Sequence, residues 1–563
     1  MMKTKFLLLS ALAALSLAAC QKDNDKGLLL IVEDMTDGAK MAVSGNVAYW
    51  AAGDQVRINN ELVTVSIDES AGTATAVSSG EGFQAPYFGV YPAAIYASNS
   101  GDSYTLKLPS SYTYATTSHF GSTIQNLGAP MVAYSASGSE LLFKHITAAL
   151  NVKVINDFGV DVRVTDITIS SNKYQLSDST TLTVGSDINV APVSAEGDGN
   201  AALRQVQMTF GGTQLIVPCG GSAVVQVPVL PVGDDNRFTI SVTVQNKDDA
   251  DMSWTFSKTQ AGNSSDGYAL GRAMVGYAPA KFGGVFTVAP GKQVYIAPGN
   301  LQYQASSGTW RFAKHQYDAI GNALGNSNFT DTRSTQDDWI DLFGWGTSGH
   351  EHGNTNYMPY VNWYTSSNYA FGYGPRTGYN YNLNLTISNN GDWGVNAISN
   401  GGNIEAIWRT LSQTQLDSLL NKRSCNTING FSNGRFAKAT IKDGVLEVQG
   451  LIIFPDDYVH PTGVDPLWAI NTTGSGGMNE NKIDLASWNK MEVAGAVFLP
   501  ITGIAKNAVI SNVDEGCYWS TTYYNNSNKY YAKCLNFKNI LLSVSDNQYR
   551  YHGCAVRLVR DVE

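Results

Sequence analysis

The chain has 563 residues, of which 15% are charged, and its net charge at neutral pH is -10. A single hydrophobic core does not grow to this size, so several domains are expected. A chain this acidic lacks the basic face that nucleic-acid binding needs, so we expect no nucleic acid among its partners.

The first residues have the pattern of a secretory signal. Lys3 and Lys5 precede a largely apolar run over 6–19, which is shorter than the about 20 residues that a membrane-spanning helix needs. The run ends in Leu-Ala-Ala-Cys at 17–20, which resembles the bacterial lipobox. The resemblance implies that residues 1–19 are removed and that Cys20 is lipidated, which anchors the protein in a membrane. An ordinary cleaved signal with an incidental cysteine is the alternative.

A short polar tether follows this cysteine. Gln21 to Asp25 resembles the acidic export signal that routes lipoproteins of Bacteroidetes to the cell surface, although a plain solvated tether has the same composition. No later run reaches transmembrane length. We therefore expect residues 20–27 to be a lipidated tether in the cell outer membrane, with the rest of the chain facing the cell exterior.

Alternating apolar and polar residues characterise the next part of the chain. The alternation is strict over 149–154, 160–169 and 238–244, and it predicts strands with one buried face. The polar stretch 246–251 then precedes a further strand pattern at 252–256, which predicts a hairpin with a six-residue turn.

Three motifs stand out among these strands. They are Trp-x-x-Gly-Asp-x-Val at 50–56, an aromatic strand ending in Tyr91-Pro92, and the run Leu142 to Leu150. Together they resemble the fimbrillin-like family, which implies two β-sandwich domains used in pilus subunits or surface adhesion scaffolds. We place these domains at 28–142 and 143–282. His145, on an apolar strand, is expected in the core.

The chain changes character near residue 283, where tryptophan and histidine become more frequent. Gly283-Gly284 is interpreted as a hinge before a third domain, 283–563. Ser412 predicts the cap of a helix that runs through Asn421, and a shorter helix is expected near Ser487 to Val493.

Four stretches of this third domain form a set. They are Trp-Arg-Thr-Leu at 408–411, Gly-Ala-Val-Phe-Leu-Pro at 495–500, Cys-Tyr-Trp-Ser-Thr-Thr at 517–522, and Gly553 to Arg560. The set resembles the C-type-lectin-like fold, in the branch of formylglycine-generating enzymes and Fibrobacter-type major paralogous surface domains. The predicted fold class is therefore mostly β, with two tandem β-sandwiches followed by an α+β, C-type-lectin-like, ligand-binding domain.

The sequence offers weak candidates for catalysis and for metal binding. Oxidases of the resembled branch need a cysteine pair, for which Cys517 and Cys534 are available, but the paralogous domains often carry other residues there. His350 and His352 lack a fixed third ligand, and the acidic residues over 337–341 lack the spacing of a calcium loop. We expect no metal, no other cofactor and no enzymatic activity.

The remaining cysteines and one acidic pair are expected to be structural. An odd number of cysteines without a Cys-x-x-Cys spacing fits neither a zinc site nor a dense disulfide framework. Buried free thiols are favoured, and one bridge among Cys517, Cys534 and Cys554 remains open. Asp456-Asp457 is expected to form an Asx turn.

The segment from Tyr518 to Tyr551 is rich in Tyr, Asn and Ser, as antibody paratopes are. Tyr supplies stiff contact area at low entropic cost, and Asn and Ser supply adaptable hydrogen bonds. Alternation also allows aromatic rings to fill the core, where Trp519 and Val556 are expected. We expect a ligand-binding face made of Tyr523, Tyr524, Asn525, Asn526, Asn528, Tyr530, Asn547, Tyr549 and Tyr551. Diversification of this face by adenine-directed mutagenesis is an open alternative.

These observations favour a surface adhesin or binding protein, such as a pilus tip or accessory subunit, that binds a host or bacterial surface glycan or protein. The alternative is a pilus shaft subunit that polymerises by strand addition. Shaft subunits lose an N-terminal segment by proteolysis, but the first arginine after Cys20 is Arg57, inside the first predicted sandwich. A formylglycine-generating type of oxidase is a remote alternative.

Overall fold

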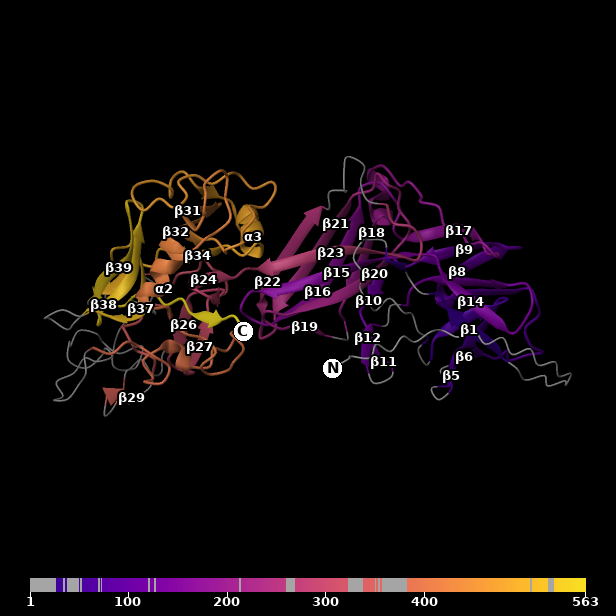
Figure 1. Cartoon of the computed structure of the whole chain (residues 1–563), viewed down its shortest axis with the longest axis horizontal. Helices are drawn as coiled ribbons and strands as arrows, with labels where there is room; N and C mark the ends of the chain where they lie inside the picture. Colours follow the sequence, from indigo (N-terminus) through magenta and orange to yellow (C-terminus); the bar gives the residue numbers. More distant parts are fainter. Residues whose placement is uncertain are drawn as a thin grey trace, which may run out of the picture.

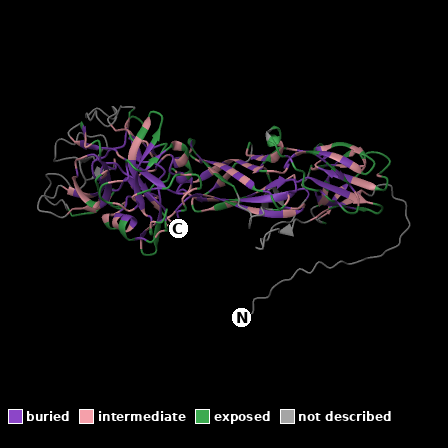
Figure 2. Ribbon diagram, turned by 90° about the horizontal axis from the view of Figure 1, so that it is seen from above, coloured by how far each residue is buried: buried purple, intermediate pink, exposed green. Residues whose placement is uncertain are grey.

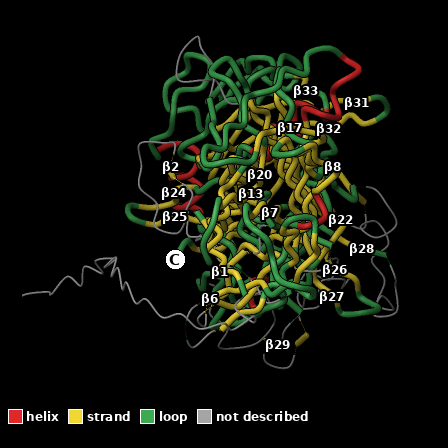
Figure 3. The backbone as a smooth tube through the Cα atoms, turned by 90° about the vertical axis from the view of Figure 1, so that its right-hand side faces the viewer, coloured by secondary structure: helices red, strands yellow, loops and turns green. Residues whose placement is uncertain are grey.

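The computed structural model describes residues 27–33, 36–37, 50, 53–68, 71, 73–119, 122–125, 128–211, 214–259, 269–321, 338–349, 351–352, 355–356, 382–506, 509–524 and 531–563. Strands account for 48% of these described residues and helices for 7%, which confirms the mostly-β prediction (Figure 3). The molecule is elongated, with the N-terminal sheets at one end and the C-terminal domain at the other (Figure 1). In the part of the chain described above, no helix is long and apolar enough to cross a membrane.

The N-terminal end is built on an eight-stranded sheet in the order β4-β3-β7-β13-β14-β1-β6-β5. Apolar side chains cover both of its faces, because a three-stranded sheet, β17-β9-β8, packs on one side. The large sheet comprises β1 (Leu28–Val32), β3 (Gln55–Ile58), β4 (Glu61–Thr64), β5 (Ser66–Asp68), β6 (Thr73–Ala76), β7 (Tyr87–Tyr91), β13 (Met131–Ser135) and β14 (Glu140–His145). The small sheet comprises β8 (Tyr96–Ser100), β9 (Ser103–Leu108) and β17 (Asp178–Thr183).

The three motifs of the fimbrillin-like resemblance meet in the core of this sheet. The Trp50 ring lies edge-on to Tyr91, with ring centroids 5.1 Å apart, and edge-on to Phe143 at 5.0 Å. The Tyr91 hydroxyl donates to the Asp54 carboxylate at 3.1 Å. Edge-to-face rings add to the energy of burial, so these motif residues form the packing centre of the sheet. His145 is buried in the core, as predicted.

The middle of the molecule consists of two facing sheets around a Val- and Ile-rich core. One sheet has the order β2-β23-β15-β20, with β2 (Thr36–Asp37), β15 (Ala148–Asp157), β20 (Ser222–Val229) and β23 (Met274–Gly283). The other has the order β10-β18-β16-β21-β22, with β19 (Leu215–Val217) also on β16. Its strands are β10 (Ser111–Thr113), β16 (Val162–Ser171), β18 (Gln205–Thr209), β21 (Phe238–Asn246) and β22 (Asp249–Thr259). The three predicted strands lie in β15, β16 and β21.

The predicted hairpin exists, but its six-residue turn is wrong. β21 and β22 pair as far as Asn246 and Asp249, so only Lys247 and Asp248 form the turn. The buried Asn246 side chain accepts a hydrogen bond from the Asp248 backbone N–H at 2.9 Å, which closes the chain tightly. Asp249 and Asp251 are part of β22 and lie on its half-buried to exposed side. Because they stand in a run of polar residues, the alternation that marks a strand could not be recognised there.

The first and second sheet systems share strands. β17 comes from residues expected in the second sandwich but pairs with β9, and β10 comes from the first but pairs with β18. The predicted boundary at 142/143 falls inside β14. A clamp reinforces the junction, because Arg272 Nη1 and Nη2 donate to the Glu33 carboxylate at 2.7 and 3.1 Å. Shared strands and this clamp join the two units closely.

The first and last parts of the C-terminal domain lie side by side, because β25, near its start, pairs with its last strand, β40. Its sheets are β24-β25-β40, β27-β26-β28, β33-β31-β32-β34, β35-β36 and β37-β38-β39. The strands are β24 (Phe286–Ala289), β25 (Lys292–Ile296), β26 (Leu301–Gln304), β27 (Thr309–Phe312), β28 (Trp339–Ile340), β31 (Phe436–Asp443), β32 (Leu446–Ile453), β33 (Lys482–Ile483), β34 (Val497–Pro500), β35 (Ile504–Lys506), β36 (Val509–Ser511), β37 (Gly516–Tyr523), β38 (Tyr531–Lys538), β39 (Leu541–Tyr549) and β40 (Val559–Asp561).

Both predicted helices are present in this domain. Ser412 caps α2 (Gln413–Asp417) in a capping box with Gln415, and the helix continues as a π-helical turn, Ser418–Lys422. Leu416, Leu419 and Leu420 are buried, as their spacing predicts. α3 (Leu485–Val493) begins two residues before the predicted start, and Asp484 is its N-cap.

The hinge predicted at Gly283-Gly284 is wrong. Gly283 is the last residue of β23, and a Cβ added there would lie 2.4 Å from the Asp157 carbonyl oxygen. A Cβ on Gly284 would lie 2.5 Å from Pro455, and one on Gly495 would lie 2.7 Å from the Gly283 carbonyl carbon. These glycines therefore allow two backbones to touch, which is close packing rather than flexibility.

Side chains extend this tight junction between the middle sheets and the C-terminal domain. Lys281 Nζ lies 2.6 Å from Asp457 and 3.4 Å from Asp157, and so links the two parts. The Asn246 amide donates to the Asn400 carbonyl at 2.7 Å. One hydrophobic cluster runs without a break from the middle sheets into the C-terminal domain, as the buried residues along the molecule indicate (Figure 2).

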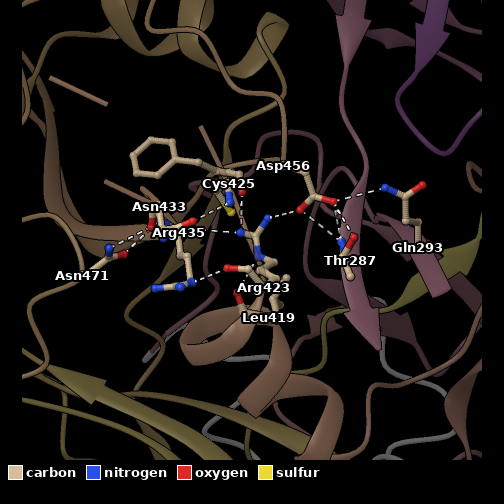
Figure 4. A network of polar contacts seen from close by, with 10 residues as sticks. Thr287, Gln293, Leu419, Arg423, Cys425, Asn433, Arg435, Asp456 and Asn471 are labelled. Carbon is tan, nitrogen blue, oxygen red and sulfur yellow. Dashed lines mark hydrogen bonds and ion pairs between the residues drawn. The ribbon is translucent and has the colours of Figure 1, made fainter. Parts of the chain in front are cut away.

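Asp456 belongs to a polar network and does not form the predicted Asx turn (Figure 4). Its carboxylate lies 2.6 Å from Arg423 Nη1 and accepts from the Thr287 hydroxyl at 2.6 Å. Arg423 is itself buried, and its Nε donates to the Leu419 carbonyl at 2.6 Å. A buried guanidinium requires several acceptors, and Arg423 finds them in the Leu419 carbonyl and the Asp456 carboxylate. Because Asp456 also binds Thr287, the network joins the end of the α2 segment to β24.

Candidate ligand-binding face

A row of aromatic rings extends from the end of β37 over β38 and β39 to the turn that follows β39. We call Tyr524, Tyr531, Tyr549, Tyr551 and His552 the tyrosine ladder. Tyr531 and Tyr549 are cross-strand partners with ring centroids 4.3 Å apart, and Tyr549 stacks on Tyr551 at 5.0 Å. Tyr524 meets Tyr531 at 6.4 Å, and His552 meets Tyr551 at 5.1 Å. Offset and edge-on rings at these distances support one another, so the ladder is a preformed surface.

A buried cation supports the ladder from below. Arg550 is 1% exposed, and its Nε donates to the Tyr531 carbonyl at 3.0 Å. Its guanidinium lies 4.6 Å from the Trp345 ring, and the Arg550 carbonyl accepts from the Trp345 backbone N–H at 2.7 Å. The Trp345 indole donates to the Ser520 carbonyl at 2.8 Å on β37. These contacts hold the three strands in register, which keeps the rings in place.

His552 and Tyr531 of the ladder are neutral near pH 7. Burial lowers the pKa of His552 to about 4, with a further contribution from Lys506, so its imidazole is uncharged. The hydrogen bond to Tyr549 raises the pKa of Tyr531 to about 12, and burial adds to that effect. Lys533 brings a positive charge to one edge, with Nζ 4.3 Å from the Tyr524 ring centroid.

The structure brings part of the predicted site together. Tyr523, Tyr524, Asn547, Tyr549 and Tyr551 are all half-buried rather than fully solvent-facing. Tyr523 packs against the large hydrophobic cluster, and Tyr551 packs against the cluster around β24 and β37. The other predicted members, Asn525, Asn526, Asn528 and Tyr530, lie outside the described residues, as does the lipidation residue Cys20.

Sequence reasoning missed Tyr531, His552 and the supporting Arg550. Tyr531 is a ladder member because it lies opposite Tyr549, a cross-strand pairing that no local pattern gives. His552 follows directly after Tyr551, but only the turn brings its ring back onto Tyr549 at 5.1 Å. The predicted core positions Trp519 and Val556 are confirmed, with 2% and 0% exposure.

The candidate metal ligands do not gather where the chain is described. No group of three His, Cys, Asp or Glu side chains among those residues could hold a metal ion. Glu351 and His352 form β29 (Glu351–His352), which pairs with β30 (Thr355–Asn356), and His350 lies outside the described residues. Asp341 is buried, and its carboxylate accepts from the Ile320 backbone N–H at 2.9 Å.

Comparisons with known proteins give structural neighbours alone. No protein-family model matches the chain, and no curated protein matches it. A solved structure described as a "putative cell adhesion protein" from Bacteroides uniformis is 14% identical, with a TM-score of 0.23, and covers 44% of this chain and 90% of its own. Proteins with the same description from Bacteroides ovatus (13% identical, TM-score 0.22, 44% and 89% covered) and Bacteroides fragilis (10%, 0.25, 45% and 92%) are also similar. Each aligns with less than half of this chain, so the functional argument below rests on this chain's own contacts.

Proposed function

We propose that this protein is a lipid-anchored adhesin of the cell outer membrane, with a C-terminal domain that binds a surface glycan or protein. The observation that carries the proposal is the position of the tyrosine ladder. β38 and β39 lie at the end of the elongated molecule that is opposite to β1 and β6 (Figure 1). A chain anchored near its N-terminus would present this end outward.

The chemistry of the ladder supports a binding role. Half-buried rings held by neighbours lose little conformational entropy when a ligand packs on them. The phenol hydroxyls add polar contacts at the ring edges, which suits a ligand with both apolar and hydroxyl-bearing faces. We therefore place the main contact area on Tyr531, Tyr549 and Tyr551.

The position of Arg57 favours an adhesin over a shaft subunit. Arg57 lies within β3, which pairs with both β4 and β7. Cleavage there would divide a core strand and remove β1 and β2, which belong to different sheets. A role at a pilus tip or as an accessory subunit remains compatible with this arrangement.

The thiols favour binding over oxidase chemistry. Cys517 and Cys534, the pair that an oxidase would need, are both 0% exposed. A reactive cysteine needs access and a stabilised thiolate, but burial raises the pKa of Cys517 well above that of a free thiol. We accordingly propose no enzymatic activity for this chain.

Binding of the purified chain to a glycan array and to host cells tests the proposal. We expect binding that a Tyr549→Ala/Tyr551→Ala double variant loses by at least tenfold. Trp468→Ala is the control, because Trp468 is 59% exposed on the same domain but is not part of the ladder. Equal binding by the wild type and the double variant would refute the ladder as the binding face.

A further inference from the structure

Three cysteines meet in the core beneath the ligand-binding face. Cys517 lies on β37, Cys534 lies on β38, and Cys554 follows β39. All three are 0% exposed, and all are free thiols in this structure. The Sγ atoms of Cys517 and Cys554 are only 2.7 Å apart.

The backbone places Cys517, on β37, beside Cys554, because an isolated parallel bridge pairs Tyr518 with Ala555. The Ala555 N–H donates to the Cys517 carbonyl at 2.9 Å, and the Trp519 N–H donates to the Ala555 carbonyl at 3.0 Å. The two thiols therefore meet from β37 and the segment paired with it, inside the core. Cys534 is opposite Trp519, so it reaches Cys517 diagonally across the sheet.

We infer that Cys517 and Cys554 are joined by a disulfide in the exported protein and that Cys534 remains a thiol. The Sγ–Sγ bond forms as both thiols lose their protons and one electron each. The oxidant is the disulfide of a thiol oxidoreductase of the cell envelope, whose own S–S bond breaks and takes up the two electrons and two protons. The reaction precedes closure of the domain, because the folded core excludes an oxidant from all three sulfurs.

This bond would frame the ligand-binding face. The two cysteines are 37 positions apart, and the loop between them contains β38, β39 and all five ladder rings. A crosslink that closes such a loop restricts the unfolded chain, and it keeps the strands beneath the ladder together if the domain opens locally.

Peptide mapping identifies the bond directly, because trypsin separates the three cysteines. Cleavage after Lys and Arg places Cys517 in 507–529, Cys534 in 534–538 and Cys554 in 551–557. We expect the chain refolded in a glutathione redox buffer, and the chain taken from cell envelopes under thiol-blocking acid conditions, to yield 507–529 linked to 551–557. Peptide 534–538 carries the blocking group in both samples. A different pair, or three blocked cysteines in either sample, overturns the inference.

Melting curves with and without a reductant distinguish a crosslink from simple packing. We expect prior reduction under denaturing conditions to lower the Tm of the wild type by about 5–10 °C. The Cys534→Ala variant should show the same drop, and the Cys517→Ala and Cys554→Ala variants should show none. Cys425→Ala is the control for a half-buried cysteine elsewhere in the domain. Reductant-independent melting of the wild type contradicts the bond.

Discussion

Tyr549 lies at the centre of the tyrosine ladder. Because it is only half-buried, its truncation should affect ligand binding more than the free energy of unfolding. It is half-buried between Tyr531 and Tyr551. We expect Tyr549→Ala to weaken ligand binding by about 2 kcal/mol, as at a binding hot spot. The same change should reduce the free energy of unfolding by about 1 kcal/mol, because little core is lost.

Tyr518 is the matched control for that measurement. It is 3% exposed, and its hydroxyl donates to the Pro500 carbonyl at 2.8 Å. Tyr518→Ala should cost about 3–5 kcal/mol of stability by leaving a cavity. Thermal melts and binding curves of both variants decide the matter, and a large loss of stability in Tyr549→Ala would show that Tyr549 is a core residue.

Asp456 makes the stability of the C-terminal domain sensitive to acid. Burial alone raises the pKa of Asp456, but hydrogen bonds from Thr287 and Arg423 outweigh that effect and lower it below its usual value. A lowered folded-state pKa stabilises the protein above the unfolded pKa of about 4, and this contribution is lost as the pH falls through the folded pKa. We expect Asp456→Asn to be less stable than the wild type at pH 7 and to lose less stability between pH 5 and pH 2.

Urea unfolding as a function of pH measures this effect. Asp443→Asn is the control, because Asp443 is exposed at the end of β31. Parallel pH curves for Asp456→Asn and the wild type would show that the carboxylate contributes nothing to acid sensitivity.

At the scale of elements, Gly495 sets the contact between α3 and the chain at Gly283. Gly495 has a φ of +95°, and a Cβ there would lie 2.7 Å from the Gly283 carbonyl carbon. Gly308, in the turn between β26 and β27, also has a positive φ of +65° but has open space around it. We expect Gly308→Ala to cost about 1–2 kcal/mol from backbone strain alone.

Gly495→Ala should cost about 3 kcal/mol or more, because backbone atoms cannot move aside as a flexible side chain can. Thermal or denaturant unfolding of the two variants makes the comparison. Equal costs would mean that the junction is loose enough to absorb a methyl group, as the hinge interpretation of Gly283-Gly284 assumed.

At the scale of the whole molecule, the N-terminal anchor determines how the face is displayed. We expect Cys20→Ser to release the protein from the membrane fraction, because the acyl chains have no other attachment site in the lipobox. Fractionation with metabolic palmitate labelling tests this. A variant that stays in the membrane fraction, together with an unlabelled wild type, would refute the lipid anchor.

Local patterns were sufficient for a large part of the fold. Alternation predicted β15, β16 and β21, and the serine cap with three leucines predicted the α2 segment, because these signals reside in neighbouring residues. The composition of 518–551 indicated the aromatic face for the same reason. The turn after Asn246 was predicted too long because a polar run looks alike in a loop and on the exposed face of a strand.

Tertiary structure alone decided the features that depend on distant partners. The exchange of β10 and β17 between sheet systems follows from hydrogen bonding to strands far along the chain. Gly283-Gly284 became a packed junction because Gly495 and Pro455 lie against it. Tyr531 belongs to the ladder because of the cross-strand register, and Cys517 lies next to Cys554 because β37 is bridged to the segment after β39. The strands, helices and aromatic segment that could be predicted from sequence are those with a local signal, since burial periodicity involves only neighbouring residues. Which of these segments contact one another depends on packing, and packing involves the whole chain at once.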